Sequence, residues 1–134
     1  MISEVMGYVF SDEKKLLQLD AIKSLLHSTY WAKNRSVSII EKSIENSLCF
    51  GIYKDKIQIG FARCVTDFAT FYWLCDVIID NKHRKKGLGK ELIKFITQHN
   101  ELKTLKGVLA TRDVKGLYEK YGFKLSTNSF MMKR

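Results

Sequence analysis

The chain alternates between short apolar runs and stretches in which apolar residues recur with helical spacing. Four runs predict β-strands at residues 5–10, 48–54, 57–67 and 71–80. The second and third strands flank the short turn at residues 54–56, which is the pattern of a β-hairpin. A sheet is therefore expected at the centre of the fold.

Strict alternation along residues 71–80 distributes the side chains of this strand over two faces. One face would carry Tyr72, Leu74, Asp76, Ile78 and Asp80, and the other Trp73, Cys75, Val77 and Ile79. Because apolar side chains occur on both faces, this strand is expected to be central and covered on both sides.

Helical spacing predicts helices before and after these strands. A first helix is expected from about Asp20 to Ser28, and a second begins near Ser36, where Ser38 and Glu41 have the spacing of a capping box. A third helix follows Gly87, and its apolar face carries Leu88, Leu92, Phe95, Ile96 and His99.

The last third of the chain predicts one more helix between short strands. Asp113 is placed to cap a helix that runs to about Tyr121, and Gly122 then occupies the position where a left-handed residue ends a helix. The strands are expected at residues 107–111 and, as a closing hairpin, at 123–125 and 130–132. This order predicts an α+β (mixed α/β) fold on one mixed sheet.

Composition adds that the chain is expected to be a single domain, residues 1–134, of a soluble globular protein. It is 46% hydrophobic and 28% charged, and no apolar run approaches the length of a membrane span, which favours a cytoplasmic location without a membrane partner.

Cys49, Cys64 and Cys75 lie in apolar runs without metal-ligand spacing, so they are interpreted as reduced core residues, and no metal is expected. The net charge of +9 favours a polyanionic partner, either cofactor phosphates or nucleic acid.

The junction between the strand at 71–80 and the following helix is the strongest candidate site. Its residues Arg84-Lys85-Lys86-Gly87-Leu88-Gly89-Lys90 combine two glycines, four cationic side chains and the unpaired N–H groups of a first helical turn, a combination that favours a phosphate or pyrophosphate. A Walker A loop would need glycine in place of Arg84 and serine or threonine in place of Glu91. A dinucleotide fingerprint would need glycine or alanine in place of Leu92.

The pattern R-x-x-G-x-G from Arg84 to Gly89 resembles the acyl-CoA-binding motif of the GNAT superfamily of N-acyltransferases. A second block, Gly116-Leu117-Tyr118-Glu119-Lys120-Tyr121-Gly122-Phe123, resembles the L-Y-E-K-x-G-F block near the end of GNAT domains. The resemblance implies a seven-stranded mixed sheet that splays into a V, about four helices, and acetyl-CoA bound in the opening.

The resemblance also implies roles for individual residues. Backbone groups of Val77, Ile78 and Ile79 would pair with the pantetheine arm and help polarise the thioester carbonyl. The pyrophosphate would be held by Arg84, Lys85, Lys86, Gly87, Leu88, Gly89 and Lys90. Many members have an asparagine where this chain has Thr111, with Asp113 as the local substitute for the pantetheine contact. Tyr118 occupies the position of the general acid that protonates the departing thiolate.

The acceptor side of the reaction is less defined by the sequence. An amine with a pKa near 10 is only about one-thousandth neutral at pH 7, so forming the neutral nucleophile costs roughly 4 kcal/mol. A base or a water chain is therefore needed to remove the proton. Asp76 is the first candidate for the catalytic base, and its alternative role is that of a structural carboxylate in the strand. The other candidates for the base are Asp67, Glu45, His27 and Tyr30. Tyr30 and Trp31, with Asp67, are expected to contact the acceptor; the alternative for the two aromatics is a hydrophobic plug.

Two functions remain open from the sequence. The first is an acetyl-CoA-dependent N-acetyltransferase that moves an acetyl group to a primary amine of a small molecule or peptide by direct attack in a ternary complex. The second is a non-catalytic basic domain that senses acyl-CoA or binds nucleic acid. The chain lacks RNP-like aromatic blocks, zinc ligands and a recognition-helix pattern, which disfavours specific nucleic-acid binding. The expected assembly is a monomer or homodimer.

Overall fold

The computed structural model describes residues 1–111, 115–126 and 130–134. Within these residues, one mixed sheet contains six strands in sequential order. They are β1 (Ile2–Val5), β2 (Tyr8–Ser11), β3 (Leu48–Lys54), β4 (Ile57–Thr66), β5 (Phe71–Ile79) and β6 (Lys106–Leu109). Neighbouring strands are antiparallel except β5 and β6, which are parallel.

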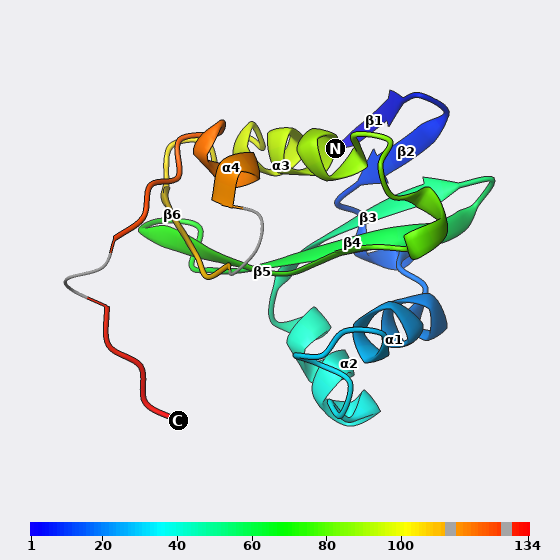
Figure 1. Cartoon of the computed structure of the whole chain (residues 1–134), viewed down its shortest axis with the longest axis horizontal. Coiled ribbons are helices and arrows are strands. Elements are labelled where there is room, and N and C mark those ends of the chain that lie inside the picture. The colour runs from blue at the N-terminus through cyan, green and yellow to red at the C-terminus, as the bar shows by residue number, and fades with distance from the viewer. Residues whose placement is uncertain (112–114, 127–129) are drawn as a thin grey trace.

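Helices cover both faces of the sheet, as Figure 1 shows. One face carries α1 (Leu19–His27) and α2 (Val37–Glu45), and the other carries α3 (Leu88–Thr97) and α4 (Lys115–Glu119). Two short 3₁₀ helices, η1 (Lys14–Leu16) and η2 (Asn81–His83), lie in the connections. The α+β class and the four α-helices predicted from the sequence are confirmed for the described part of the chain.

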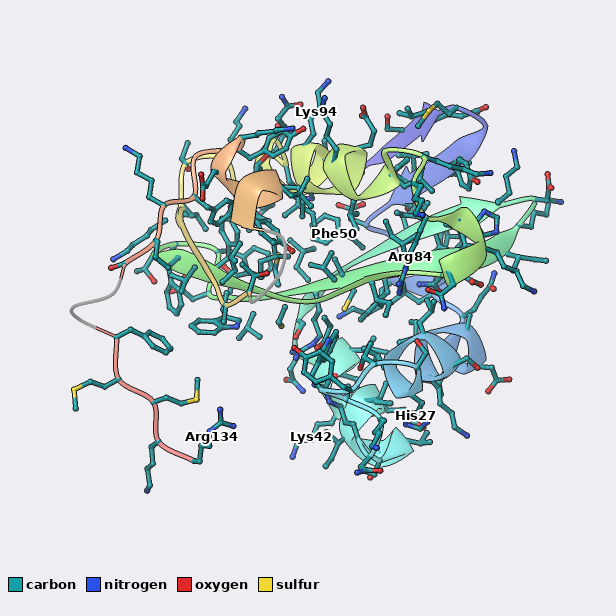
Figure 2. The ribbon with its side chains drawn as sticks, in the orientation of Figure 1. His27, Lys42, Phe50, Arg84, Lys94 and Arg134 are labelled. Atoms are coloured by element: carbon teal, nitrogen blue, oxygen red, sulfur yellow. The ribbon has the colours of Figure 1, made fainter. Side chains whose placement is uncertain are left out.

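Two apolar cores follow from this layering. On the α3 face, Phe50 is fully buried and packs edge-on against the ring of Phe95 (Figure 2). On the α1 and α2 face, Ile22, Ile40 and Phe61 are fully buried in a second cluster. The sheet therefore separates two apolar cores. A site at its edge is supported by packed helices on both faces.

The first strand predicted at residues 5–10 is a hairpin instead. Val5 pairs with Tyr8, and the two residues between them, Met6 and Gly7, have φ values of +54° and +81°. Two consecutive positive φ values are typical of the tight turns that match the twist of β-hairpins. Methionine rarely marks such a turn, so only Gly7 pointed to it and the turn was not predicted.

Strand β5 contains a bulge that corrects the predicted assignment of its faces. Phe61 pairs with Ile78 and Arg63 with Cys75, so two residues of β5 stand opposite one of β4. Asp76 lies in this bulge with φ +54°. An extra residue shifts all later side chains to the opposite face. Ile78 accordingly packs in the α1 and α2 core rather than sharing the α3 face with Leu74.

The C-terminal end contains fewer strands than predicted. A closing hairpin was expected here, but its described residues, 123–126 and 130–134, form no strand. The sheet of the described residues therefore has six strands rather than the expected seven. The predicted end of α4 is confirmed, because Gly122 has φ +92° and the N–H groups of Gly122 and Phe123 donate to the carbonyls of Glu119 and Tyr118. The predicted helix cap Asp113 lies outside the described residues.

The helices of the α1 and α2 layer begin close to where they were predicted. α1 starts one residue before the expected Asp20 and ends at His27. α2 is capped by Ser36, whose Oγ accepts from the N–H of Ile39 at 3.3 Å, and the predicted capping box of Ser38 and Glu41 is therefore wrong by two residues.

The parallel pair β5 and β6 separates halfway along. Pairing runs from Phe71 with Lys106 to Leu74 with Leu109 and then stops, although β5 continues to Ile79. The second half of β5 therefore has no strand on that side within the described residues. This is the V-shaped opening expected from the sequence.

Candidate functional site

The opening between β5 and β6 forms a cleft of about 990 Å³. Its walls come from the connection between α1 and α2, the second half of β5, the loop before α3, the end of β6 and α4. We call the part formed by residues 79–90 the loop end of the cleft. We call the part formed by residues 29–31, 73, 75 and 76 the aromatic end.

The loop end presents backbone N–H groups rather than a side-chain pocket. Lys85 and Gly87 have φ values of +64° and +79°, and Gly87 is the N-cap of α3. Because glycine has no side chain to cap the helix, the N–H groups of the first turn are left for a ligand. Left-handed residues beside a helix N-terminus form a concave, electropositive surface that suits an anion.

Side chains fix this loop to the body of the protein. The Nε of Arg84 donates to the carbonyl of Ile79 at 3.0 Å, and Arg84 projects from the loop beside the end of β5 (Figure 2). The hydroxyl of Tyr8, a buried residue of β2, lies 2.8 Å from Nδ1 of His83. These two contacts tie the loop to two different strands of the sheet.

Gly89 leaves room at the floor of the loop end. A Cβ at this position would lie 3.8 Å from the side-chain ends of Ile79 and Leu117, both of which line the cleft. That spacing is ordinary van der Waals contact, so the protein itself does not require glycine here. The absence of a side chain instead keeps the cleft open next to the free N–H groups.

Tyr118, a residue of α4, lies in the cleft wall. Its side chain is buried among Leu117, Phe123 and the α3 core, and the Phe123 ring packs edge-on against it with centroids 6.0 Å apart. The carbonyl of Tyr118 accepts from the N–H of Phe123, so the helix end fixes both rings. Burial raises the pKa of the Tyr118 phenol, which therefore stays protonated at neutral pH.

The aromatic end exposes large ring surfaces. Tyr30 and Trp31, from the connection between α1 and α2, are 64% and 43% exposed and line the cleft. Trp73 lines it from β5 and stacks on Phe130, with ring centroids 5.7 Å apart. These rings give the aromatic end a flat apolar surface.

Asp76 holds a cluster of charges beneath this end. Its Oδ2 accepts from Nη1 of Arg35 at 2.7 Å and from Nε of Arg63 at 2.9 Å, and Arg63 also donates to Ser47 Oγ at 3.0 Å. The Asp76 side chain is only 4% exposed. Paired with two guanidinium groups, this carboxylate is engaged in structure, which favours the alternative to its predicted role as a base.

The structure brings most of the predicted residues to one cleft. The predicted site residues that line it are Tyr30, Trp31, Asp76, Val77, Ile78, Ile79, Arg84, Lys85, Gly87, Leu88, Gly89, Thr111 and Tyr118. Their individual roles stay predictions. Lys86 and Lys90 flank the loop end without lining the cleft, and Asp113 lies outside the described residues.

Of the remaining base candidates, Tyr30 lines the cleft, whereas Asp67, His27 and Glu45 do not. Asp67 accepts from the N–H groups of Ala69 and Thr70 in the exposed turn before β5, and the Thr70 hydroxyl is the main cause of its lowered pKa. His27 is held through Nε2, 2.7 Å from the carbonyl of Arg35, on the α1 and α2 side (Figure 2). Asp67, His27 and Glu45 are absent from the cleft wall. The predicted contact between Asp67 and an acceptor is therefore not supported.

Three residues of the site were not predicted from the sequence. His83 and Trp73 line the cleft, and Arg35 reaches Asp76 across 41 positions in the chain. His83 directly precedes the R-x-x-G-x-G pattern, which was a usable signal. Nothing local marks Arg35 or Trp73.

The described part of the chain contains no group of three or more His, Cys, Asp or Glu side chains placed to hold a metal ion. Among its helices, none has the length and apolar character needed to cross a membrane.

Comparison with known proteins identifies a family for this chain. The family model of the acetyltransferase (GNAT) domain matches residues 45–125. A ycf52-like N-acetyltransferase of Prochlorococcus marinus, itself uncharacterized, is 30% identical over 125 residues, covering 88% of this chain and 68% of that protein. The chain spans 63% and 68% of the lengths of two curated relatives that it matches.

Solved structures extend the likeness to the fold. A protein of Xanthomonas campestris pv. campestris assigned to the GNAT family has a TM-score of 0.91 at 35% identity, covering 98% of this chain and 95% of that one. A GNAT family acetyltransferase of Elizabethkingia anophelis, crystallised with acetyl-CoA bound, has a TM-score of 0.70 at 16% identity, covering 92% and 80%. The second likeness bears on the fold alone.

Proposed function

Because the chain belongs to the GNAT family of acetyltransferases, we propose that it transfers an acetyl group from acetyl-CoA to a primary amine by direct attack in a ternary complex. The observation that carries this proposal is the cleft between β5 and β6, whose wall contains both the uncapped N-terminus of α3 and a buried, protonated tyrosine. When bound, acetyl-CoA supplies the acetyl thioester.

The loop end fits the phosphates of acetyl-CoA. The N–H groups of the first turn of α3 and the side chains of Arg84 and Lys85 would hold the pyrophosphate. Gly89 allows the backbone to approach this group closely, since a Cβ there would project toward the cleft floor. Backbone groups of Val77 to Ile79, which line the cleft beyond the last β5–β6 pair, would take the pantetheine arm. Thr111 lines the cleft on the opposite side.

Tyr118 is proposed as the general acid. Transfer of the acetyl group breaks the C–S bond and leaves a thiolate, which departs more readily if it receives a proton. Because burial raises the pKa of Tyr118, its hydroxyl is fully protonated at pH 7 and available as a donor. The Tyr118 side chain lines the cleft, where a bound ligand can reach it.

Direct attack is favoured over an acyl-cysteine route. Cys75 is the one thiol in the described cleft wall, and its Sγ donates to the carbonyl of Arg63 at 3.4 Å. Burial raises its pKa to about 11, so it is a thiol rather than a thiolate at neutral pH. A Cys75→Ala variant is therefore expected to retain acetyl transfer.

The test is release of free thiol from acetyl-CoA over a panel of polyamines, aminoglycosides, amino acids and peptides with free N-termini. We expect amine-dependent release and intersecting lines when both substrates are varied. Parallel lines would indicate a covalent intermediate and contradict direct attack. Absence of release with every amine, together with binding of acetyl-CoA, would favour the sensor alternative.

The net charge of +9 is the observation that keeps nucleic acid in consideration. If the charge served to hold DNA or RNA, affinity would fall steeply with salt and acetyl-CoA would not compete. We expect only weak, non-specific binding of nucleic acid. A tight, sequence-selective complex that is insensitive to acetyl-CoA would overturn the enzyme proposal.

A further inference from the structure

The cleft wall contains few side chains that could take a proton from an incoming ammonium group. Among the described residues that line the cleft, those with titratable side chains are Tyr30, Cys75, Asp76, His83, Arg84, Lys85, Tyr118 and Arg134. Arginine, lysine and tyrosine side chains are ordinarily protonated at neutral pH and do not act as bases there. Burial keeps Cys75 and Tyr118 protonated as well, so both are proton donors in this site.

Asp76 is poorly suited to accept the proton. Its Oδ2 is hydrogen-bonded to both Arg35 and Arg63, whose side chains are 23% and 15% exposed. This oxygen is therefore already engaged by two donors from the protein, and an incoming ammonium group would compete with both of them.

His83 belongs to the loop end rather than to the aromatic end. It directly precedes Arg84 and Lys85, and its Nδ1 is paired with the hydroxyl of Tyr8. The contact with Tyr8 holds His83 beside β2, and β3 and β4 lie between β2 and β5 in the sheet. A proton donor bound at the aromatic end is thus remote from this imidazole.

The charge of the Asp76 cluster acts in the same direction. Two guanidinium groups face one carboxylate, which leaves one positive charge in excess beneath the aromatic end. A positive neighbour disfavours the protonated form of an amine and so favours its neutral form. The site selects an acceptor that loses its proton easily.

Resting on the proposed function, we infer that the acceptor is an α-amine, carried by an amino-acid derivative or by the N-terminus of a peptide, rather than a lysine side chain, a polyamine or an aminoglycoside. An α-amino group has a pKa of about 7.7–8.0 and a lysine side chain about 10.4, so their neutral fractions at pH 7 differ roughly 300-fold. An α-amine therefore reaches the thioester as a nucleophile without a base from the protein. The residue attached to it would lie against Trp31 and Trp73.

The test compares matched acceptors with the wild-type protein by thiol release from acetyl-CoA. Alanine methylamide supplies an α-amine, a peptide beginning with alanine supplies the same amine on a longer chain, and Nα-acetyl-lysine methylamide supplies a side-chain amine. We expect kcat/KM at pH 7 to be about 100-fold or more higher for either α-amine than for the lysine derivative. The ratio of the first two acceptors shows whether the free derivative or the peptide is preferred.

The pH profile provides the second readout. Without a protein base, log kcat/KM should rise with unit slope up to the pKa of the acceptor's own amine. The midpoint should then move to higher pH when alanine methylamide is replaced by free alanine, whose amine is more basic. In Asp76→Asn the midpoint should stay where it is, even if the rate changes.

Two results would overturn the inference. One is acetylation of the lysine derivative or of spermidine as efficiently as the α-amines at pH 7. The other is a midpoint that is the same for both alanine acceptors and is lost in Asp76→Asn or Asp113→Asn, which would identify that carboxylate as a base. Failure of every amine together with failure to bind acetyl-CoA would remove the proposed function as well, so the two failures are distinguishable.

Discussion

The two ends of the cleft are built in different ways. The loop end is made mostly of backbone from one contiguous segment, residues 79–90, with Gly87 and Lys85 in left-handed conformations. The aromatic end is made of side chains from separate segments, and Arg35 meets Asp76 although 41 positions lie between them. A site built from contiguous backbone leaves a short motif in the sequence, whereas a site built from distant side chains does not.

Tyr118 offers the largest test, because it is the proposed general acid in the wall of the cleft that contains both ends. Tyr118→Phe removes the hydroxyl and retains the ring that packs on Phe123. General acid catalysis contributes about 10²- to 10⁴-fold, so kcat should fall by that range while the affinity for acetyl-CoA is retained. Steady-state kinetics and calorimetric binding measure the two effects separately.

Tyr121→Phe is the matched control. Tyr121 follows α4 and packs against the same core, but it does not line the cleft. Its loss should have little effect on kcat. Equal, small losses in both variants would show that Tyr118 is only a packing residue.

Asp76→Asn is expected to affect stability more than coenzyme binding. Asparagine tolerates the positive φ of this position, so the variant removes charge without adding backbone strain. Removing one partner of a buried ion pair costs about 3 kcal/mol, and Tm should fall by roughly 10 °C. Thermal unfolding measures this, with exposed Asp67→Asn as the control that should change Tm much less.

If Asp76→Asn instead left Tm unchanged, the Arg35–Asp76–Arg63 cluster would not be the support of the aromatic end. The bulge in β5 would then be maintained by the strand pairing on either side of it.

Gly89→Val tests the loop end in the opposite way, because it should impair binding while preserving the fold. The nearest protein atoms to a Cβ at this position are 3.8 Å away, so valine should be accommodated in the free protein. In the complex it would occupy space next to the helix N–H groups. Losing one or two hydrogen bonds to a charged ligand costs about 2–3 kcal/mol, or roughly 30- to 150-fold in Kd.

Gly89→Ala should give an intermediate loss, which makes the effect graded with side-chain size. Isothermal titration with acetyl-CoA measures Kd, and circular dichroism checks the fold. Unchanged affinity in a folded Gly89→Val protein would refute the assignment of the loop end.

The smallest expected effect concerns the contact that links the loop end to β2. Tyr8→Phe removes the hydroxyl that pairs with His83, and one hydrogen bond of about 1 kcal/mol would raise the Kd for acetyl-CoA roughly fivefold. Tyr53→Phe is the control, because its buried hydroxyl has no hydrogen-bond partner within the described residues. Tyr53→Phe should leave Kd unchanged and Tm unchanged or slightly higher. A loss of affinity of the same size in both variants would argue against a specific role for the Tyr8–His83 contact.

The sequence predicted those features that depend on neighbouring residues. The start of α3 after Gly87 and the helix end at Gly122 follow from local backbone preferences, and both were located correctly. The bulge at Asp76 was missed because the prediction assumed regular alternation along the strand, and an aspartate in mid-strand does not by itself indicate a bulge. The ion pairs of Asp76 were missed for a different reason: they depend on how the connection before α2 packs against β4 and β5, which no local pattern specifies.

The most direct measurement of the central claim is backbone amide hydrogen exchange with and without acetyl-CoA. The account predicts that acetyl-CoA slows exchange in two segments, residues 85–90 at the start of α3 and residues 77–79 in β5, because these N–H groups would become donors to the ligand. It also predicts little change along the outer face of α3, where Lys94 projects away from the sheet (Figure 2). Protection spread over the basic surface with none at residues 85–90 would contradict the claim that this cleft is the acetyl-CoA site.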